Sequence, residues 1–139
     1  MKEKFTQSVQ AAITRLALPA SYHQAVEGVV GALATEISNL HQAMGRPIVV
    51  GLNGSQGSGK STVSEFLKLS LELLHGIPTA VMSLDDIYLS KSAREKLALE
   101  VHPLLRTRGV PGTHQISLGL ETIDSLLSAS DTSSTLLPS

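Results

Sequence analysis

A glycine-rich segment, residues 54–61 with the sequence GSQGSGKS, constrains the fold of this 139-residue chain more than any other feature. Residues 48–52 before it form a short apolar run that is typical of a buried parallel strand. Residues 60–74 after it have the apolar spacing of an amphipathic helix, with Val63, Phe66, Leu67, Leu71 and Leu74 on one face. A strand, a tight turn and a helix in this order favour an α/β fold.

The glycine-rich segment matches the pattern G-x-x-x-x-G-K-[ST] in full, which predicts a phosphate-binding loop. Glycines let the backbone N–H groups turn toward phosphate oxygens, and the N-terminus of the following helix favours the same anion. Lys60 would place its charge on the outer phosphates of ATP, and the Ser61 hydroxyl would ligate Mg²⁺. The alternative is a surface turn that binds nothing. The predicted ATP-binding residues are Gly54, Ser55, Gln56, Gly57, Ser58, Gly59, Lys60, Ser61 and Thr62.

A pair of carboxylates, Asp85 and Asp86, follows a second predicted strand at residues 79–84. Ligands bind at the carboxyl ends of strands in open α/β sheets. Either carboxylate would there serve as the base, or the orienting group, that a phosphoryl-accepting hydroxyl needs. The alternative is that the pair caps the next segment or is simply solvated.

The remaining apolar spacing predicts helices at residues 3–17, 92–99 and 116–127, and one that begins after Ser21, with Gln24 at the capping-box position. The stripe of this last helix, Val26, Val29 or Val30, Leu33, Ile37 and Leu40, is interpreted as core or interface packing. Residues 101–114 are expected to form a loop, and residues 136–137 to begin a third strand. The predicted organisation is a helical segment at residues 1–45 and a core at residues 46–139.

Composition excludes several classes of protein. Eleven Lys plus Arg against twelve Asp plus Glu give a net charge of −1, which argues against a nucleic-acid or polybasic membrane binder. The chain has no cysteine, and its five histidines lack metal-ligand spacing, so no protein-held zinc site is expected. With no long apolar run and no signal-peptide pattern, we expect a soluble cytoplasmic protein.

Beyond these patterns, residues 48–62 followed by SLDDIYL at residues 83–89 resemble the P-loop kinases related to phosphoribulokinase, uridine kinase and pantothenate kinase. The continuation VHPLL at residues 101–105 and RGVPGTH at residues 108–114 is similar to the D-glycerate 3-kinase branch. The resemblance implies a P-loop NTPase-type parallel sheet with flanking helices. It also implies transfer of the ATP γ-phosphate to a hydroxyl of a small metabolite, D-glycerate in this branch.

By position, the resemblance implies that Asp85 is the catalytic base, acting together with Lys60. Tyr88 and Asp86 match the acceptor site. Arg108 and His114 lie in the loop that closes around the acceptor. The loop usually ends in Thr-His-Asp in this family, whereas Gln115 stands here in place of the aspartate. Family members are also much longer, so we expect an incomplete domain, the N-terminal part of such a kinase, able to self-associate through exposed sheet edges.

Two other functions stay open: a nucleotide-binding module without turnover, and a kinase for a nucleoside or pantothenate. Several single residues also have two interpretations. Arg106 and Arg108 are either solvated or bind an anionic acceptor group. His102 is either a loop residue or part of the site. The charges on the short helix, Lys91, Arg94 and Lys96, are expected to form a solvated face.

Overall fold

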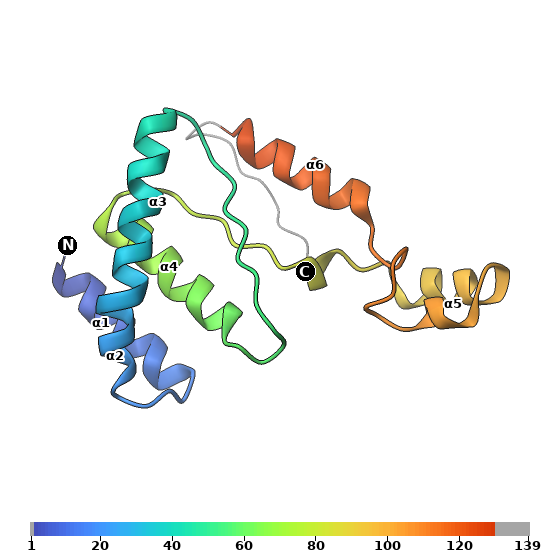
Figure 1. Ribbon diagram of the computed structural model, residues 1–139, viewed down its shortest axis with the longest axis horizontal. Helices are drawn as coiled ribbons and strands as arrows, with labels where there is room; N and C mark the ends of the chain where they lie inside the picture. The colour runs from blue at the N-terminus through green and yellow to red at the C-terminus, as the bar shows by residue number, and fades with distance from the viewer. Residues whose placement is uncertain (1, 130–139) are drawn as a thin grey trace. The chain divides into compact units, whose positions relative to one another are not determined.

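The computed structural model describes residues 2–129 of the chain (Figure 1). The chain divides into two compact units, Met1–Val81 and Met82–Ser139, which we call unit 1 and unit 2. The boundary predicted at residue 45 lies inside unit 1 and stays a prediction. No helix within residues 2–129 is both long enough and apolar enough to cross a membrane.

Unit 1 is a packed group of helices. In chain order they are α1 (Lys2–Arg15), α2 (Tyr22–Ala25), the π-helix η1 (Val26–Val30), α3 (Gly31–Met44) and α4 (Lys60–Leu74). The periodicity therefore predicted α1 and α4 correctly. Their buried faces meet in one core, in which the ring of Phe66 lies tilted against Tyr22 with a centroid separation of 5.4 Å. The buried core residues are Val9, Ala12, Ile13, Val26, Val30, Ala34, Phe66, Leu67 and Leu71.

The stripe predicted for the second helix is confirmed in part, since Val26 and Val30 are buried and Ile37 packs against the core. Val26, Val30 and Ala34 point into the core, whereas Val29 is 73% exposed and Leu33 also lies at the surface. The buried positions recur every four residues through η1 and on into α3, where Ser38 is buried as well. Ser21 has helical dihedrals and makes no side-chain cap, so the predicted capping box is wrong.

The predicted parallel sheet is wrong: the described residues contain no strand. Residues 48–52 and 79–82 follow irregular paths, and Val49 is 64% exposed. A strand exists only where a neighbour accepts and donates backbone hydrogen bonds, and apolar composition alone supplies no such neighbour. Within residues 2–129 there is likewise no sheet edge for the predicted self-association to use. The third strand predicted at residues 136–137 lies outside the described residues.

Unit 2 holds four shorter elements, in the order η2 (Leu84–Ile87), α5 (Lys91–Glu100), η3 (Pro103–Arg106) and α6 (Ile116–Leu127), where η2 and η3 are 3-10 helices. The two predicted α-helices are confirmed, and η3 lies within the predicted loop. The buried residues of α6 are Gly119 and Thr122, whereas Leu120 is 57% exposed. A Cβ added at Gly119 would sit 3.0 Å from Cδ1 of Ile87, so this glycine permits the close approach of α6 to η2.

Candidate functional site

The predicted phosphate-binding loop of unit 1 is shaped by its glycines. Gly57 and Gly59 have φ angles of 76° and 82°, a left-handed conformation that residues with a side chain rarely adopt. A Cβ added at Gly54 would sit 2.8 Å from Oγ of Ser58, the end of a side chain that can turn away, so only Gly57 and Gly59 require glycine for their backbone conformation. The Ser58 amide donates a hydrogen bond of 3.2 Å to the Ser55 carbonyl, which closes the turn. The loop then leads directly into α4.

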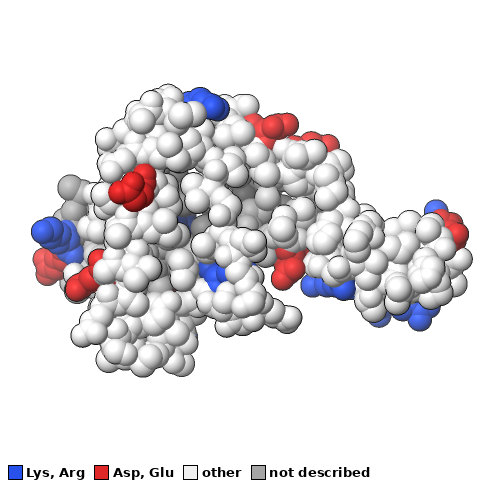
Figure 2. Space-filling view, viewed as in Figure 1, with Lys and Arg blue, Asp and Glu red and all other residues white. Residues whose placement is uncertain are grey.

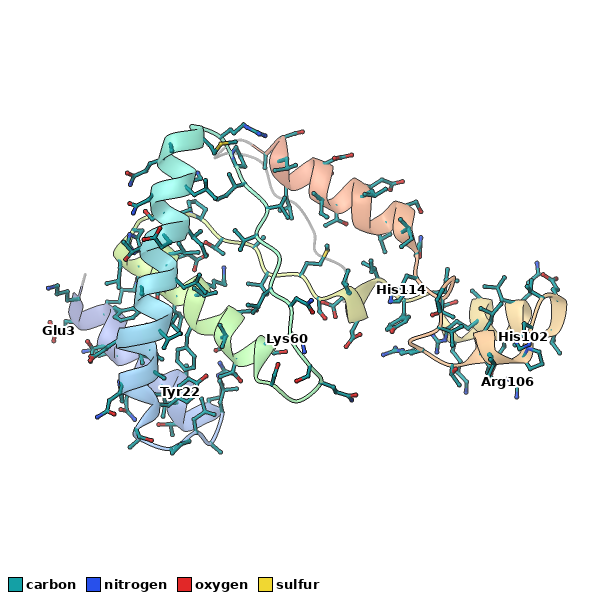
Figure 3. The ribbon with its side chains drawn as sticks, viewed as in Figure 1. Glu3, Tyr22, Lys60, His102, Arg106 and His114 are labelled. Carbon is teal, nitrogen blue, oxygen red and sulfur yellow. The ribbon has the colours of Figure 1, made fainter. Side chains whose placement is uncertain are left out.

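Lys60, the first residue of α4, folds back over this loop (Figure 3). Its ammonium donates hydrogen bonds of 2.8 Å to the Gly54 carbonyl and 2.7 Å to the Ser55 carbonyl. A cation is therefore fixed between the start of the loop and the start of a 15-residue helix. A positive charge beside a helix N-terminus attracts an anion.

Ser61 and Thr62 follow Lys60 in the first turn of α4, where the Ser61 side chain is exposed. Among the described residues, neither hydroxyl has a hydrogen-bond partner within the protein, so both can take part in binding a ligand. No group of three or more His, Cys, Asp or Glu side chains able to hold a metal occurs in residues 2–129. A metal ion held here would therefore depend on a hydroxyl such as that of Ser61 and on oxygens from a bound ligand.

The two aspartates of unit 2 differ in their surroundings. Asp86 caps its own turn, since its carboxylate accepts a hydrogen bond of 3.0 Å from the Ser83 amide. The Ser83 hydroxyl in turn accepts one of 3.1 Å from the Asp85 amide. The Asp85 carboxylate is exposed and has no hydrogen-bond partner among the described residues. Asp86 thus has a structural role, while the Asp85 carboxylate is available for chemistry.

A short antiparallel ladder joins the segment after η2 to the end of the 101–114 loop. The Leu89 amide donates to the Thr113 carbonyl at 2.9 Å, and the Gln115 amide donates to the Ile87 carbonyl at 2.7 Å. Between these two bonds, Tyr88 lies opposite His114 as an isolated bridge. Residues paired in this position carry their side chains close together on one side. The ladder therefore brings together two predicted acceptor-site residues that are far apart in sequence.

The side chains of Tyr88, His114 and Arg108 form one cluster. The Tyr88 and His114 rings stack with their centroids 4.1 Å apart. The Arg108 guanidinium carbon lies over the Tyr88 ring, 5.2 Å from its centroid, which is within the range of a cation–π interaction. The cluster contains a guanidinium, an imidazole and a phenol hydroxyl. All of these groups can bind an anionic or hydroxylated small molecule.

The two lysines of α5 and His102 interact with other groups of unit 2. Lys91 and Lys96 form exposed ion pairs within α5, with Glu95 at 3.9 Å and Glu100 at 3.8 Å, and Figure 2 shows the mixed charges at this helix. The solvated face predicted there is confirmed for both lysines. His102 caps η3, because its Nδ1 accepts a hydrogen bond of 3.3 Å from the Leu104 amide, and this favours the loop interpretation.

Arg94 is the residue that the sequence interpretation missed. It is only 9% exposed, although the sequence predicted a solvated side chain. Its Nε donates to the Arg106 carbonyl at 3.3 Å, and its Nη1 donates to the Leu89 carbonyl. The buried residues of α5 are Arg94 and Ala98, which lie four residues apart on one face of the helix. This spacing was the signal in the sequence that could have indicated a buried Arg94.

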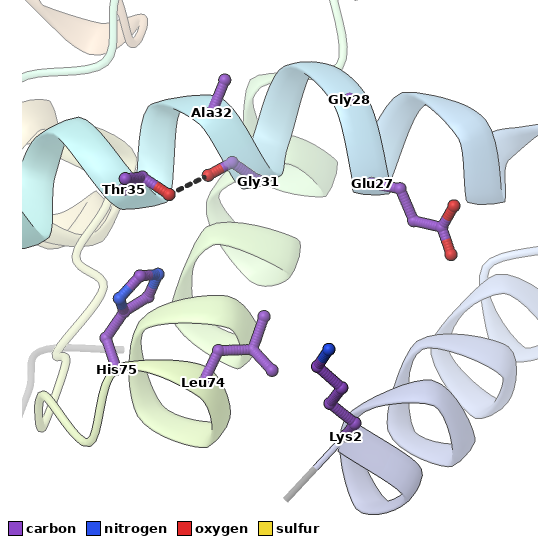
Figure 4. Close-up of a pocket in the computed structure, with 8 residues that line it drawn as sticks. All are labelled: Lys2, Glu27, Gly28, Gly31, Ala32, Thr35, Leu74 and His75. Atoms are coloured by element: carbon purple, nitrogen blue, oxygen red, sulfur yellow. Dashed lines mark hydrogen bonds between the residues drawn. The ribbon is translucent and has the colours of Figure 1, made fainter.

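Unit 1 also contains an open pocket of about 630 Å³ beside α3 and the end of α4 (Figure 4). None of the loop residues 54–61 takes part in its lining, so it is separate from the predicted phosphate site. Small residues of η1 and α3 form one wall, and the side chains of Lys2 and Glu27 stand at one end. The lining residues are Lys2, Glu27, Gly28, Gly31, Ala32, Thr35, Leu74 and His75.

Comparison with known proteins finds similarity to kinases. The chain is 37% identical over 90 residues to the uncharacterized kinase mug58 of Schizosaccharomyces pombe, a match that covers 63% of this chain and 32% of the relative. It is 33% identical over 85 residues to the chloroplastic D-glycerate 3-kinase of Arabidopsis thaliana, with 58% of this chain and 18% of the relative covered. No protein-family model matches the chain.

A solved structure is similar as well. The YGR205w protein matches with a TM-score of 0.60 and 28% identity, over 73% of this chain and 38% of that chain. The resemblance inferred from the sequence is thereby confirmed: this chain is similar to kinases, one of which is named a D-glycerate 3-kinase. The chain spans about a third or less of the length of the curated relatives it matches.

Proposed function

We propose that this chain is the ATP-binding part of a kinase that phosphorylates a hydroxyl group of a small anionic metabolite, D-glycerate being the first candidate. The observation that carries the proposal is the glycine-shaped loop closed around the Lys60 ammonium at the start of α4. The identity to a D-glycerate 3-kinase and to a second kinase supports the same reaction class.

The loop fits the phosphates of ATP because its shape depends on the absence of side chains. Gly57 and Gly59 hold left-handed conformations that residues with a side chain rarely adopt. Lys60, Ser61 and the first amides of α4 would hold the phosphates together with Mg²⁺. Bound ATP and Mg²⁺ supply the transferable phosphoryl group and neutralise its charge. The loop residues bind and orient them.

In unit 2, Asp85 would accept the proton of the acceptor hydroxyl as its oxygen attacks the γ-phosphorus. The supporting observation is that its carboxylate is exposed, whereas the Asp86 carboxylate is engaged in capping. Arg108, His114 and Tyr88 would hold the carboxylate and hydroxyl groups of the acceptor, because their donors lie together in one cluster.

The test is ADP release by the purified chain with Mg-ATP and, in turn, D-glycerate, uridine and pantothenate. We expect turnover with D-glycerate, no turnover for Lys60→Ala, and loss of turnover with intact ATP binding for Asp85→Asn. Asp86→Asn is the matched control, because an asparagine can still cap the turn and should keep most of the activity. Wild-type turnover in Asp85→Asn would contradict its assignment as the base.

The second candidate is a module that binds nucleotide without transferring phosphate. The observation that favours it is that the contacts shaping the loop all lie within unit 1. ATP binding that depends on Lys60, with no ADP release on any acceptor, would decide for this function. Turnover on uridine or pantothenate alone would keep the kinase and replace its substrate.

A further inference from the structure

We propose that Arg94 is a positioning residue: its guanidinium clamps the two segments that carry Tyr88 and Arg108, and so assembles the acceptor-binding cluster. The inference deepens the proposed function and rests on it for the cluster's role. The clamp itself rests only on the contacts of Arg94.

Arg94 is buried, and within residues 2–129 its guanidinium forms no ion pair with a carboxylate. Its charge is satisfied by two backbone carbonyls, those of Leu89 and Arg106. Burying a guanidinium costs free energy unless its donors are hydrogen-bonded. The donors of Arg94 thus bond to the backbone of two separate segments, whereas the exposed lysines of the same helix form ion pairs with glutamates of that helix.

The two carbonyls belong to the two segments that carry the cluster. Leu89 directly follows Tyr88, and its amide is also bonded to the Thr113 carbonyl beside His114. Arg106 ends η3, two residues before Arg108. The guanidinium thus joins the end of η3 to the segment that forms the ladder with Thr113 and Gln115. Thr113, which is 0% exposed, tightens the loop further, since its hydroxyl donates to the Val110 carbonyl at 2.6 Å.

Only an arginine can make these two hydrogen bonds in a fixed geometry. The guanidinium holds its N–H donors in a rigid plane, so Nε and Nη1 can reach two carbonyls in fixed directions. A lysine ammonium is a compact charge on a flexible chain and does not impose that geometry. The proposal therefore predicts that Arg94→Lys fails to keep the cluster together although it keeps the charge.

The test is NMR of the 139-residue chain, because its readout does not depend on turnover. In the wild type we expect a nuclear Overhauser contact between the Tyr88 and His114 rings and slow hydrogen exchange at the Leu89 and Gln115 amides. In Arg94→Lys and Arg94→Met we expect loss of the contact and about tenfold faster exchange at these amides, with the amides of α5 still protected. Lys96→Met, on the exposed face of α5, and Arg46→Lys, an exposed arginine of unit 1, are the controls.

If the ring contact and the protection persist in Arg94→Lys, the clamp is overturned, whatever Arg94→Met does to folding. Turnover supplies the second readout. If Arg94 positions the cluster, Arg94→Lys should lower kcat/KM for the acceptor by about 100-fold and leave the KM for ATP unchanged. An equal loss for ATP and acceptor would overturn a positioning role. A wild type without turnover contradicts the proposed function, and the NMR result still decides on the clamp.

Discussion

The predicted phosphate-binding loop of unit 1 and the cluster of Tyr88, Arg108 and His114 in unit 2 hold their shapes by different means. The loop is formed by eight consecutive residues. Its glycines in the left-handed conformation allow the turn, and the Lys60 ammonium closes it by hydrogen bonds to two carbonyls of the loop. The cluster is assembled from segments 26 residues apart, from Tyr88 to His114, by two ladder hydrogen bonds and a buried arginine. A short sequence motif is enough to specify the shape of the loop. The shape of the cluster depends on contacts between residues that are distant in sequence, and a short motif does not contain them.

The largest expected effect concerns Lys60. Lys60→Ala removes a charged donor, so nucleotide binding should weaken by about 2 kcal/mol, or roughly 30-fold in Kd. Titration calorimetry with Mg-ATP measures it. Lys4→Ala, an exposed lysine of α1, is the matched control and should leave the Kd unchanged. Equal binding by wild type and Lys60→Ala would show that the loop does not hold phosphate.

The second-largest effect is expected when the backbone conformation of the loop is changed. Gly59→Ala forces a side chain into a left-handed conformation and should destabilise unit 1 by about 1–2 kcal/mol. Urea unfolding followed by circular dichroism measures the change. Gly51→Ala is the control, because a Cβ there meets nothing within 4 Å and the φ angle is ordinary. An equal loss of stability in both variants would contradict the claim that Gly59 is needed for its left-handed backbone conformation.

A smaller effect is expected where unit 2 relies on a side chain. Thr113→Val removes the hydroxyl that bonds to the Val110 carbonyl and keeps the shape, so unit 2 should lose about 1 kcal/mol. Hydrogen exchange at the Leu89 amide reports the change. In Thr35→Val, an exposed hydroxyl of α3 with the same kind of bond, we expect less than about 0.5 kcal/mol. A loss no greater than this in Thr113→Val would refute the dependence of the ladder on the buried threonine.

The smallest effect is a gain. Gln115 precedes α6 without a side-chain cap. Gln115→Asp should therefore stabilise the helix by about 0.5–1 kcal/mol by accepting a hydrogen bond from the first turn. Thermal unfolding measures it, and Gln115→Asn separates the cap from the added charge. The ladder bond uses only the Gln115 amide, so it should survive in both variants. A lower melting temperature in both would mean that the end of the loop cannot accommodate a cap.

The sequence predicted the parts of the molecule that depend on neighbouring residues. The spacing around Phe66 and Leu71 predicted α4, and the GSQGSGKS pattern predicted the loop. The prediction of paired strands was wrong. The apolar run at residues 48–52 favours an extended, buried segment, but it does not specify a neighbouring strand to pair with. The prediction of a solvated Arg94 was wrong for a similar reason. Charged residues on a short helix are usually solvated, and the Arg106 carbonyl that binds Arg94 is distant in sequence.

The π turn at residues 26–30 bears on how this chain should be aligned. It amounts to one extra amino acid accommodated inside a helix without moving the core-facing side chains that follow. Homologues that lack the insertion are expected to be one position shorter around Gly28 and Val29, both at the surface, and to keep the equivalents of Val26 and Ala34 in the core. A gap placed there in an alignment marks a change in helix type rather than a change in fold.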